Sequence, residues 1–508
     1  MVFCSYDSVK DFKAPLNAAP LVNKDGLPAF EVTIKGEKTI LTAKEVNTKF
    51  LKTLYASAQD FLGRKPDAAV FAIPLDFSSE QQEALKEASK DAGVEIKQFV
   101  PDVAAASIVY GLTSSPRDTS FSIGDRNILL LDIGASTTNA TVLAVRNGLL
   151  SILSAVQDSR LGGDDLDTKL VEFLTKEFTK RTKVPWDPSN HRAVSKLYLE
   201  VESTKRTLSA STTATCAVES LAEGMDFSAT VNRTRFDLLA RDVYSRILSK
   251  ATEAISQASL DSVQIHEVDF RSLSRLARPI TSSLSQVILL GGTAKLPSLQ
   301  SKIQDLFAEH TKVTTTIDPD EAVAKGAALQ ADLIFNIPSS VPVDLSKAES
   351  VSKNVPALSQ PLGLLLGSNK EKNRFALLMD QNTPLPARKI IELGIPSSTN
   401  SSSSVVLSLW QGKHSIQIEQ PKTNGSKANG KKNDDSEDED EPEEIKHAIV
   451  KADSLVANLV CKVNGESKGK GRNAEPEKVR VTLVVGKEGK GSLQGQQGKT
   501  GEVFKIEF

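Results

Sequence analysis

The chain has 508 residues, of which 39% are hydrophobic and 25% charged, so it is long enough for roughly two to four domains and has the composition of a globular protein. Its formal net charge of −2 gives no overall attraction toward nucleic acid or a membrane surface. The three cysteines have no metal-ligand spacing, and neither a secretory leader nor an apolar run of about eighteen residues is visible. We therefore expect a cytoplasmic protein with no disulfide framework and no metal ligands.

The first predicted elements are a hairpin and a helix. Residues 30–34 and 39–41 flank a Lys-Gly-Glu turn, which is typical of a hairpin. Thr42 and Glu45 form a capping-box pattern that starts a helix, and Gly63 ends it. This helix carries one apolar stripe, made of Val46, Phe50, Leu54, Ala58 and Phe61.

A second set of alternating elements follows. We expect a strand over residues 69–73, a helix that begins after Ser78, a strand near 94–96 and a helix over 104–110. The order strand, helix, strand, helix predicts an α/β layer.

The stretch from residue 128 to 145 resembles a buried hairpin with a close-approaching turn. An apolar run ends at Asp132, a turn of small residues follows, and Gly134 would let the backbone approach an anion. Further on, Gly162 and Gly163 precede a predicted helix, whose free N–H groups favour phosphate. Two glycines that serve only as a tight connection would give the same pattern.

A polar helix face and a third glycine turn complete this pattern. Glu202, Lys205, Arg206 and Ser209 project from one face of a predicted helix over residues 191–209, where they could hold a purine and ribose. A solvated charged face is the alternative interpretation. The apolar strand over 286–290 runs into Gly291 and Gly292, and a helix follows Asp318-Pro319-Asp320. Three glycine turns with a purine-type face between them predict a nucleotide site.

The C-terminal third is predicted to be a β domain. Residues 336–359 are polar, and short strands are expected over 361–367, 374–379, 389–394, 405–410, 414–419, 478–485 and 503–508. The segment 421–447 is basic and then strongly acidic, a composition typical of disorder. It is either a solvating insert or a docking site for a basic partner.

Several of these stretches resemble the seventy-kilodalton heat-shock chaperone (DnaK-type) family, in the family's order. They include LLLDIGASTT, LGGDDLD, KRTLSAST, ESLAEGMDF, LLGGTAKLP and DPDEAVAKGAALQA. The resemblance implies an α/β actin-like (ribonuclease H-like) two-lobed nucleotide-binding domain, followed by an all-β sandwich that resembles a peptide-binding domain.

The resemblance also implies domain boundaries. Residues 1–120 would be a remnant of lobe I, N-terminally truncated because the family's first phosphate loop has no counterpart here. Residues 121–338 would be lobe II with an insertion at 269–284, residues 339–360 a polar linker, and residues 361–508 the β sandwich with its insert and without a helical lid.

Carried over residue by residue, the resemblance implies an ATP site, with Mg²⁺ as a possible companion. Asp132 falls on the catalytic position. The nucleotide-binding positions are Gly134, Ala135, Ser136, Thr137, Gly162, Gly163, Glu202, Lys205, Arg206, Ser209, Gly291, Gly292, Lys295 and Asp320.

Departures from the family pattern indicate weak hydrolysis. Ala135 and Ser136 replace two glycines, which would be strained if φ were positive there. Asn139 stands where the family tends to carry an acid, and Val100-Pro101-Asp102 replaces a Glu-Pro pair out of register by one. The linker is polar rather than apolar.

The combination most resembles the atypical, lidless subunit of the fungal ribosome-associated complex. The resemblance predicts a nucleotide-binding scaffold that hydrolyses ATP weakly or not at all. It would act with a J-domain protein at the ribosome and help a second, active chaperone of the same family on nascent chains. The alternative is an ATP-hydrolysing chaperone that binds unfolded peptides itself; a sugar-kinase-type enzyme is disfavoured because it has no place for the β domain.

Overall fold

The computed structural model describes residues 6–9, 19–112, 126–146, 149–258, 260, 284–307, 311–337, 356–366, 374–395, 402–419, 445–464, 477–497 and 502–508. Residues 269–283 of the predicted insertion, residues 421–444 of the insert and most of the polar linker lie outside these residues. Among the described helices, none has the length and apolarity needed to cross a membrane.

The N-terminal region contains a three-stranded antiparallel sheet, a pair of parallel strands and the helices that flank them. Its elements are α1 (Tyr6–Val9), β1 (Leu21–Lys24), β2 (Leu27–Ile34), β3 (Glu37–Thr42), α2 (Ala43–Leu62), β4 (Ala69–Ile73), α3 (Ser79–Ala92), β5 (Ile96–Pro101) and α4 (Asp102–Val109). The predicted capping boxes at Thr42 and Ser78 are both present, and Gly63 ends α2 with a left-handed φ of 66°. The local signals in the sequence therefore fix where α2 and α3 begin and where α2 ends.

The apolar stripe of α2 does not lie in a core. Leu51 and Tyr55 turn the helix toward α3 and join a small cluster with Ala88 and Val94. Phe50 and Phe61, about 80–100° round the helix from Leu51, are left exposed. The apolar stripe of an amphipathic helix normally faces the core. In α2 most of the predicted stripe faces away from the described core.

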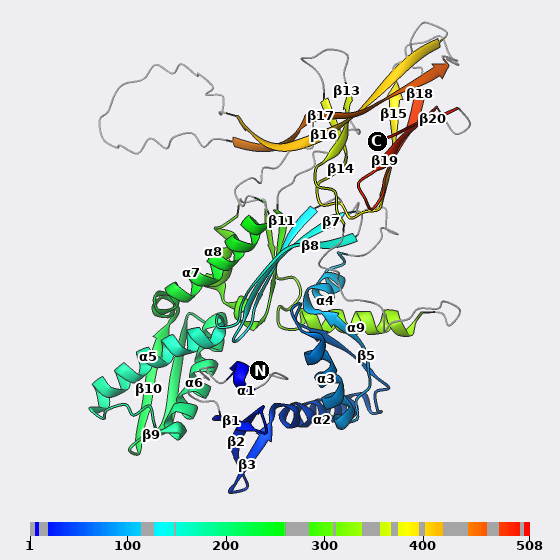
Figure 1. Ribbon diagram of the computed structural model, residues 1–508. Coiled ribbons are helices and arrows are strands. Elements are labelled where there is room, and N and C mark those ends of the chain that lie inside the picture. Colours follow the sequence, from blue (N-terminus) through cyan, green and yellow to red (C-terminus); the bar gives the residue numbers. More distant parts are fainter. Residues whose placement is uncertain are drawn as a thin grey trace, which may run out of the picture.

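A five-stranded sheet with order β12-β11-β6-β7-β8 forms the centre of the molecule (Figure 1). Its strands are β6 (Arg126–Ile133), β7 (Thr138–Arg146), β8 (Leu149–Asp158), β11 (Leu284–Leu290) and β12 (Lys312–Thr314). Leu129 and Leu131 point into a large core with the neighbouring helices, whereas Ile128 and Leu130 point into a second core with α4. Both faces of the sheet are thus covered, which explains why β6 is apolar without alternation.

The elements that surround this sheet are mainly helical. They are α5 (Gly163–Thr182), α6 (His191–Ala210), the hairpin β9 (Thr213–Ala222) and β10 (Met225–Asn232), α7 (Arg233–Gln257), the short 3₁₀ helix η1 (Gly292–Lys295), α8 (Pro297–Gln304) and α9 (Ala322–Phe335). The helix predicted over 191–209 is confirmed as α6.

The C-terminal region consists of two four-stranded antiparallel sheets, ordered β14-β13-β16-β17 and β15-β18-β19-β20. Its strands are β13 (Leu362–Leu366), β14 (Arg374–Met379), β15 (Ala387–Ile395), β16 (Ser402–Glu419), β17 (Ile445–Asn464), β18 (Glu477–Val485), β19 (Gly491–Gln497) and β20 (Val503–Glu507). The two strands predicted over 405–410 and 414–419 are one strand, β16, whose pairing with β17 shifts register near Trp410 and Gly412. The sequence did not predict β17 or β19.

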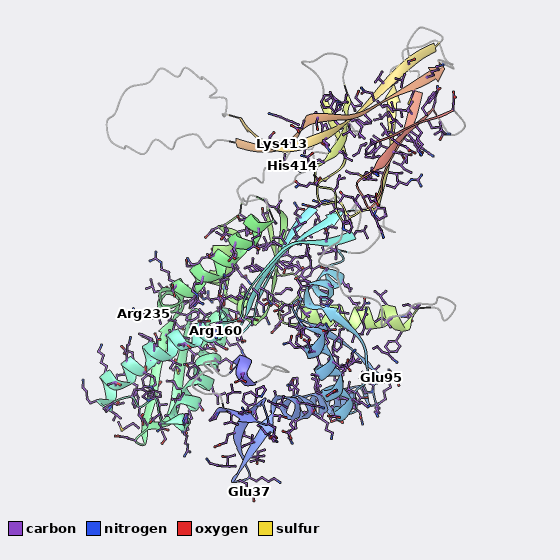
Figure 2. All side chains as sticks on the ribbon, viewed as in Figure 1. Glu37, Glu95, Arg160, Arg235, Lys413 and His414 are labelled. Carbon is purple, nitrogen blue, oxygen red and sulfur yellow. The ribbon has the colours of Figure 1, made fainter. Side chains whose placement is uncertain are left out.

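A buried ion pair joins the central sheet to the C-terminal region. The side chain of Arg146 at the end of β7 is 3% exposed and that of Asp380 is 2% exposed, with 3.6 Å between Arg146 Nη2 and Asp380 Oδ2. Arg146 also donates to Asn127 Oδ1 at 2.9 Å and to the Arg126 carbonyl. From β16, His414 (labelled in Figure 2) places its Nε2 atom 3.1 Å from the other carboxylate oxygen of Asp380.

Removing one partner of this pair leaves the other charge buried without a counter-ion, which is far more destabilising than breaking an exposed pair. We expect Asp380→Ala to lower the free energy of unfolding by about 3–5 kcal/mol in urea denaturation. Glu392→Ala, which breaks the exposed pair with Arg480, is the control and should cost less than about 1 kcal/mol. If both variants lowered the free energy of unfolding by the same amount, Asp380 would not be part of a buried ion pair that stabilises the fold.

Candidate functional site

The three predicted glycine turns lie against one another. The Gly163 N–H donates to the Gly134 carbonyl at 3.1 Å, and the Asp164 N–H donates to the Ala135 carbonyl at 2.7 Å. The Thr293 hydroxyl donates to the Gly134 carbonyl at 2.9 Å. Segments that are well separated along the chain therefore share one point of contact at the turn between β6 and β7.

Glycine is required at two of these turns by close backbone approach. A Cβ at Gly162 would overlap the Ala135 carbonyl, and a Cβ at Gly291 would overlap the Ile133 carbonyl and lie 2.6 Å from Asp132 Oδ1. Gly291 also has a φ of 82°, which a side chain rarely adopts. Gly292 differs, because nothing lies within 4 Å of a Cβ built there.

Strand register explains why Asp132 lies at this contact. β11 runs parallel to β6 with Leu290 opposite Asp132, so Gly291 follows at the same edge of the sheet. On the other side, Asp132 pairs with Asn139 across the β6–β7 hairpin. The acid, the amide and the third glycine turn are thereby fixed by sheet hydrogen bonding.

The turn itself is closed by a hydrogen bond from the Gly134 N–H to the Thr137 carbonyl at 2.9 Å. Neither Ala135 nor Ser136 is among the described residues that combine a side chain with a positive φ. We predicted backbone strain at Ala135 and Ser136 if their φ angles were positive. They are not, so this strain is absent.

A cavity of about 110 Å³ opens beside Asp132 and Asn139. Asp76, Asp102 and Gln157 also line it, so three carboxyl groups and two amides border the same space. Asn139 Oδ1 is buried and has no hydrogen-bond partner among the described residues. A buried polar atom without a partner is suited to a ligand or water that supplies the missing bond.

Burial dominates the electrostatics of this cavity. It raises the pKa of Asp102 to about 6; a hydrogen bond from the Val103 N–H opposes this, and the nearby charges of Asp132 and Asp76 add to it. Burial likewise raises the pKa of Asp132. Carboxyl groups of this kind hold a proton more readily than exposed ones.

The sequence passed over Asp76 and gave Asp102 only as an uncertain substitute for a family glutamate. A signal for both existed, because Asp76 follows β4 and Asp102 follows β5. These strands pair in parallel, so their carboxyl ends lie at one edge.

The polar residues predicted on one face of helix α6 pair mainly with other residues of the chain. Lys205 Nζ lies 2.6 Å from Asp167 Oδ2 and also donates to the Gly163 carbonyl at 3.1 Å, which brings α6 to the second glycine turn. Arg206 pairs with Glu202 at 2.6 Å on the exposed surface. The Ser209 hydroxyl donates to the Arg206 carbonyl.

Lys295 forms a third pairing. Its Nζ lies 2.7 Å from Asp318 Oδ1 and 2.9 Å from Asp320 Oδ1. The hydrogen bonds that Lys295 donates to these two acids raise the pKa of Lys295, and the same lysine lowers the pKa of Asp320. Each predicted cation of the site thus holds a carboxylate of its own chain.

The residues fit a phosphate-bearing ligand better than a preformed metal site. Two glycine turns pack so closely on neighbouring backbone that a Cβ would not fit, which leaves the turns without side chains at this point. The unpartnered Asn139 oxygen at the cavity can accept a hydrogen bond from water or from a donor group of a ligand. Within the described ranges, no group of three or more acidic, histidine or cysteine side chains is arranged to hold a metal ion. Mg²⁺ usually needs only one or two carboxylates together with phosphate oxygens and water.

The raised pKa of Asp102 makes stability depend on pH. Because the folded pKa of about 6 lies above the unfolded value near 4, the folded state binds the extra proton, and this contribution to stability is lost as the pH rises through 6. In the wild type, protonation of Asp102 should raise the free energy of unfolding by about 1 kcal/mol as the pH falls from 7 to 5. The Asp102→Asn variant should lack this rise.

Urea denaturation across that pH range measures the effect. Asp187→Asn is the control, because two Ser189 hydrogen bonds lower the pKa of Asp187 below its ordinary value, so this group stays ionised and contributes no pH dependence between pH 5 and pH 7. If the wild type and Asp102→Asn have parallel profiles, Asp102 is not the responsible group.

Comparison with known proteins identifies the family. The family model described as Hsp70 protein matches residues 6–270 and 272–423. A heat shock protein 70 homologue of Schizosaccharomyces pombe is 31% identical over 90% of this chain and 76% of its own length. The ribosome-associated complex subunit SSZ1 of Saccharomyces cerevisiae is 31% identical over 79% of this chain and 69% of its own length. The heat shock 70 kDa protein of Neurospora crassa is 30% identical over 73% and 51%.

Hsp70 proteins are chaperones that generally bind ATP and work with J-domain co-chaperones on substrate peptides. Their mixed α/β nucleotide-binding region precedes a β-rich region of the peptide-binding type, which is the order of the two regions described above. This chain belongs to the Hsp70 family.

Proposed function

We propose that this protein is an atypical Hsp70 chaperone that binds ATP, hydrolyses it weakly or not at all, and acts as a scaffold. Its partners would be a J-domain protein and cytoplasmic ribosomes, where it would help a second, active chaperone of the same family on nascent chains. The observation that carries the proposal is the hairpin pairing of Asp132 with an amide, Asn139, where a second carboxylate would help to organise Mg²⁺ and water.

In this proposal the α/β region is an actin-like, two-lobed domain with its second lobe over residues 121–338, and the β sandwich covers residues 361–508. The phosphates would lie at the turn 134–137 and the Gly162-Gly163 pair. The Gly162 and Gly163 N–H groups would then have to exchange their present bonds, to Asp165 Oδ2 and the Gly134 carbonyl, for bonds to phosphate. Adenosine would be held by α6 and by the turn at Gly291, Gly292 and Lys295, with Asp320 on the ribose side.

The internal ion pairs support weak or absent turnover. Lys205 and Lys295 must leave Asp167 and Asp318 if they are to contact a ligand. Cations that already have partners contribute less to a developing phosphate charge than cations free to move toward it.

One observation favours an ATP-hydrolysing chaperone instead. The pKa of Asp102, about 6, lies close to neutral pH, which suits a general base that must accept a proton from water. The two functions differ in turnover, so a kinetic experiment separates them.

The first test compares ATP binding with ATP turnover. We expect calorimetry to detect ATP binding, and Glu202→Ala with Ser209→Ala to weaken it by about tenfold, because both side chains lie on the proposed adenosine face. Leu199→Ser, at an exposed position of the same helix, should leave binding unchanged.

Single-turnover hydrolysis should be slow, with or without a J domain, and should rise in Asn139→Asp. Hydrolysis by the wild-type protein that a J domain stimulates strongly would overturn the proposal in favour of the active chaperone.

The second test concerns the partners. One relative at 31% identity bears the name of a ribosome-associated complex subunit, but the other relative at the same identity bears none. We expect the tagged protein to sediment with ribosomes together with a J-domain protein in a sucrose gradient. Sedimentation only in the ribosome-free fractions would contradict the ribosomal role.

A further inference from the structure

The solvent-facing side of α5 carries a row of lysines. The helix buries its leucines and Phe178 in the large core, so the roughly opposite side faces outward. That side carries Lys169, Lys176, Lys180 and Lys183, of which Lys169 is half-buried and the others are exposed. At 100° per residue all four fall within a sector of about 60°, so they form one row along the helix. Figure 1 shows α5 at the edge of the α/β region, away from the C-terminal sheets.

An arginine from α7 extends this row. The guanidinium carbon of Arg235 lies 5.4 Å from the centre of the Phe173 ring on α5. Phe173 comes four residues after Lys169 and three before Lys176, so it shares their flank of the helix. Arg235, which is labelled in Figure 2, therefore adds its charge beside the lysines. We call these five cations the α5 basic row (Lys169, Lys176, Lys180, Lys183 and Arg235).

The α5 basic row has more positive than negative charge. None of its five members has an ion-pair partner among the residues that the structure describes. The neighbouring acids Asp165 and Glu177 already pair with other arginines. Glu172 and Asp242 are exposed acids beside the row without an ion pair, so five cations are opposed by two acids. This local excess occurs in a chain whose formal net charge is −2, and it would attract a polyanion.

The lack of exposed apolar side chains distinguishes between kinds of polyanionic partner. No large hydrophobic side chain of α5 is among the exposed ones. A protein interface usually has an apolar core from which lysine is depleted, and a membrane-bound amphipathic helix inserts its apolar face. The apolar face of α5 is instead buried in the core of its own chain. Nucleic-acid interfaces are polar and strongly positive, which is the character of the α5 basic row.

The shape of the row favours contact with a phosphate backbone rather than with bases. From Lys169 to Lys183 it extends about 21 Å along the helix. The deep, narrow major groove of an RNA duplex does not admit such a helix, whereas its phosphates are accessible from outside. Phe173 lies under Arg235, so the row offers no open aromatic ring on which an unpaired base could stack.

We propose that the α5 basic row is a docking surface for the phosphate backbone of double-stranded RNA, which it contacts without reading the base sequence. The choice of RNA over DNA rests on the ribosomal role proposed above. Lysine ammonium groups and the Arg235 guanidinium contact phosphate oxygens and displace the cations condensed on the duplex.

Fluorescence anisotropy of a labelled RNA duplex of about 20 base pairs, titrated with the full chain, tests the proposal. We expect saturable binding with a Kd of about 1 μM at roughly 50 mM KCl. A plot of log K against log[KCl] should have a slope of about −4, because five cations each displace slightly less than one counter-ion. A second duplex of unrelated sequence should bind equally well.

A double variant on the row tests the location of the site. Lys176→Gln/Lys180→Gln should weaken binding at least about tenfold at low salt and make the slope less negative by about two. Glutamine has nearly the same helix propensity as lysine, so the thermal unfolding midpoint should not change.

The matched control is Lys413→Gln/Lys451→Gln. These two exposed lysines lie opposite each other on β16 and β17, and neither has an ion pair with a described residue. Lys413 is labelled in Figure 2. The control removes the same net charge as the row variant but should leave both the affinity and the slope unchanged.

Three results would each overturn the proposal. They are the absence of saturable RNA binding at low salt, a row variant that binds as tightly as the control, and binding to phosphatidylserine vesicles without binding to RNA. The assay contains no nucleotide, J-domain protein or ribosome, so a negative result leaves the proposed chaperone function standing. Conversely, RNA binding by a protein that does not sediment with ribosomes would contradict the ribosomal role and leave this surface in place.

Discussion

Backbone contact between the three glycine turns is the constraint on which the site depends. The Gly134 carbonyl accepts hydrogen bonds from the Gly163 N–H and from the Thr293 hydroxyl, so one atom ties the hairpin to α5 and to the segment after β11. Side chains at Gly162 or Gly291 would hold these segments apart. Asp132 and the cavity beside it acquire their positions from this contact.

The cations near the glycine turns already have carboxylate partners. Lys205, Arg206 and Lys295 each lie within 3 Å of an acidic side chain of the same chain. These pairs keep the surface ordered without a ligand, and they also set a free-energy cost for any ligand that must separate them. Binding and turnover need not change together in such a site, because only contacts that strengthen in the transition state accelerate the reaction.

The sequence predicted what depends on local signals. The capping boxes at Thr42 and Ser78, the β6–β7 hairpin and the glycine turns were recognisable because the residues that define them are close together in the chain. It failed where distant segments decide the outcome. The exposed side of α2 depends on which face α3 covers, and the Arg146–Asp380 pair joins residues more than two hundred positions apart. The irregular pairing of β16 with β17 interrupts the alternation that would have marked one long strand.

The strand β7 carries two features at opposite ends. Asn139 pairs with Asp132 near its beginning, and Arg146 meets Asp380 at its end, about 23 Å away for seven extended residues. A strand hydrogen-bonded on both sides, as β7 is by β6 and β8, does not shorten or bend easily. β7 is therefore a stiff connection between the cavity and the C-terminal sheets. Any shift of the hairpin along its axis has to be taken up at the buried guanidinium, where there is little free volume to absorb it.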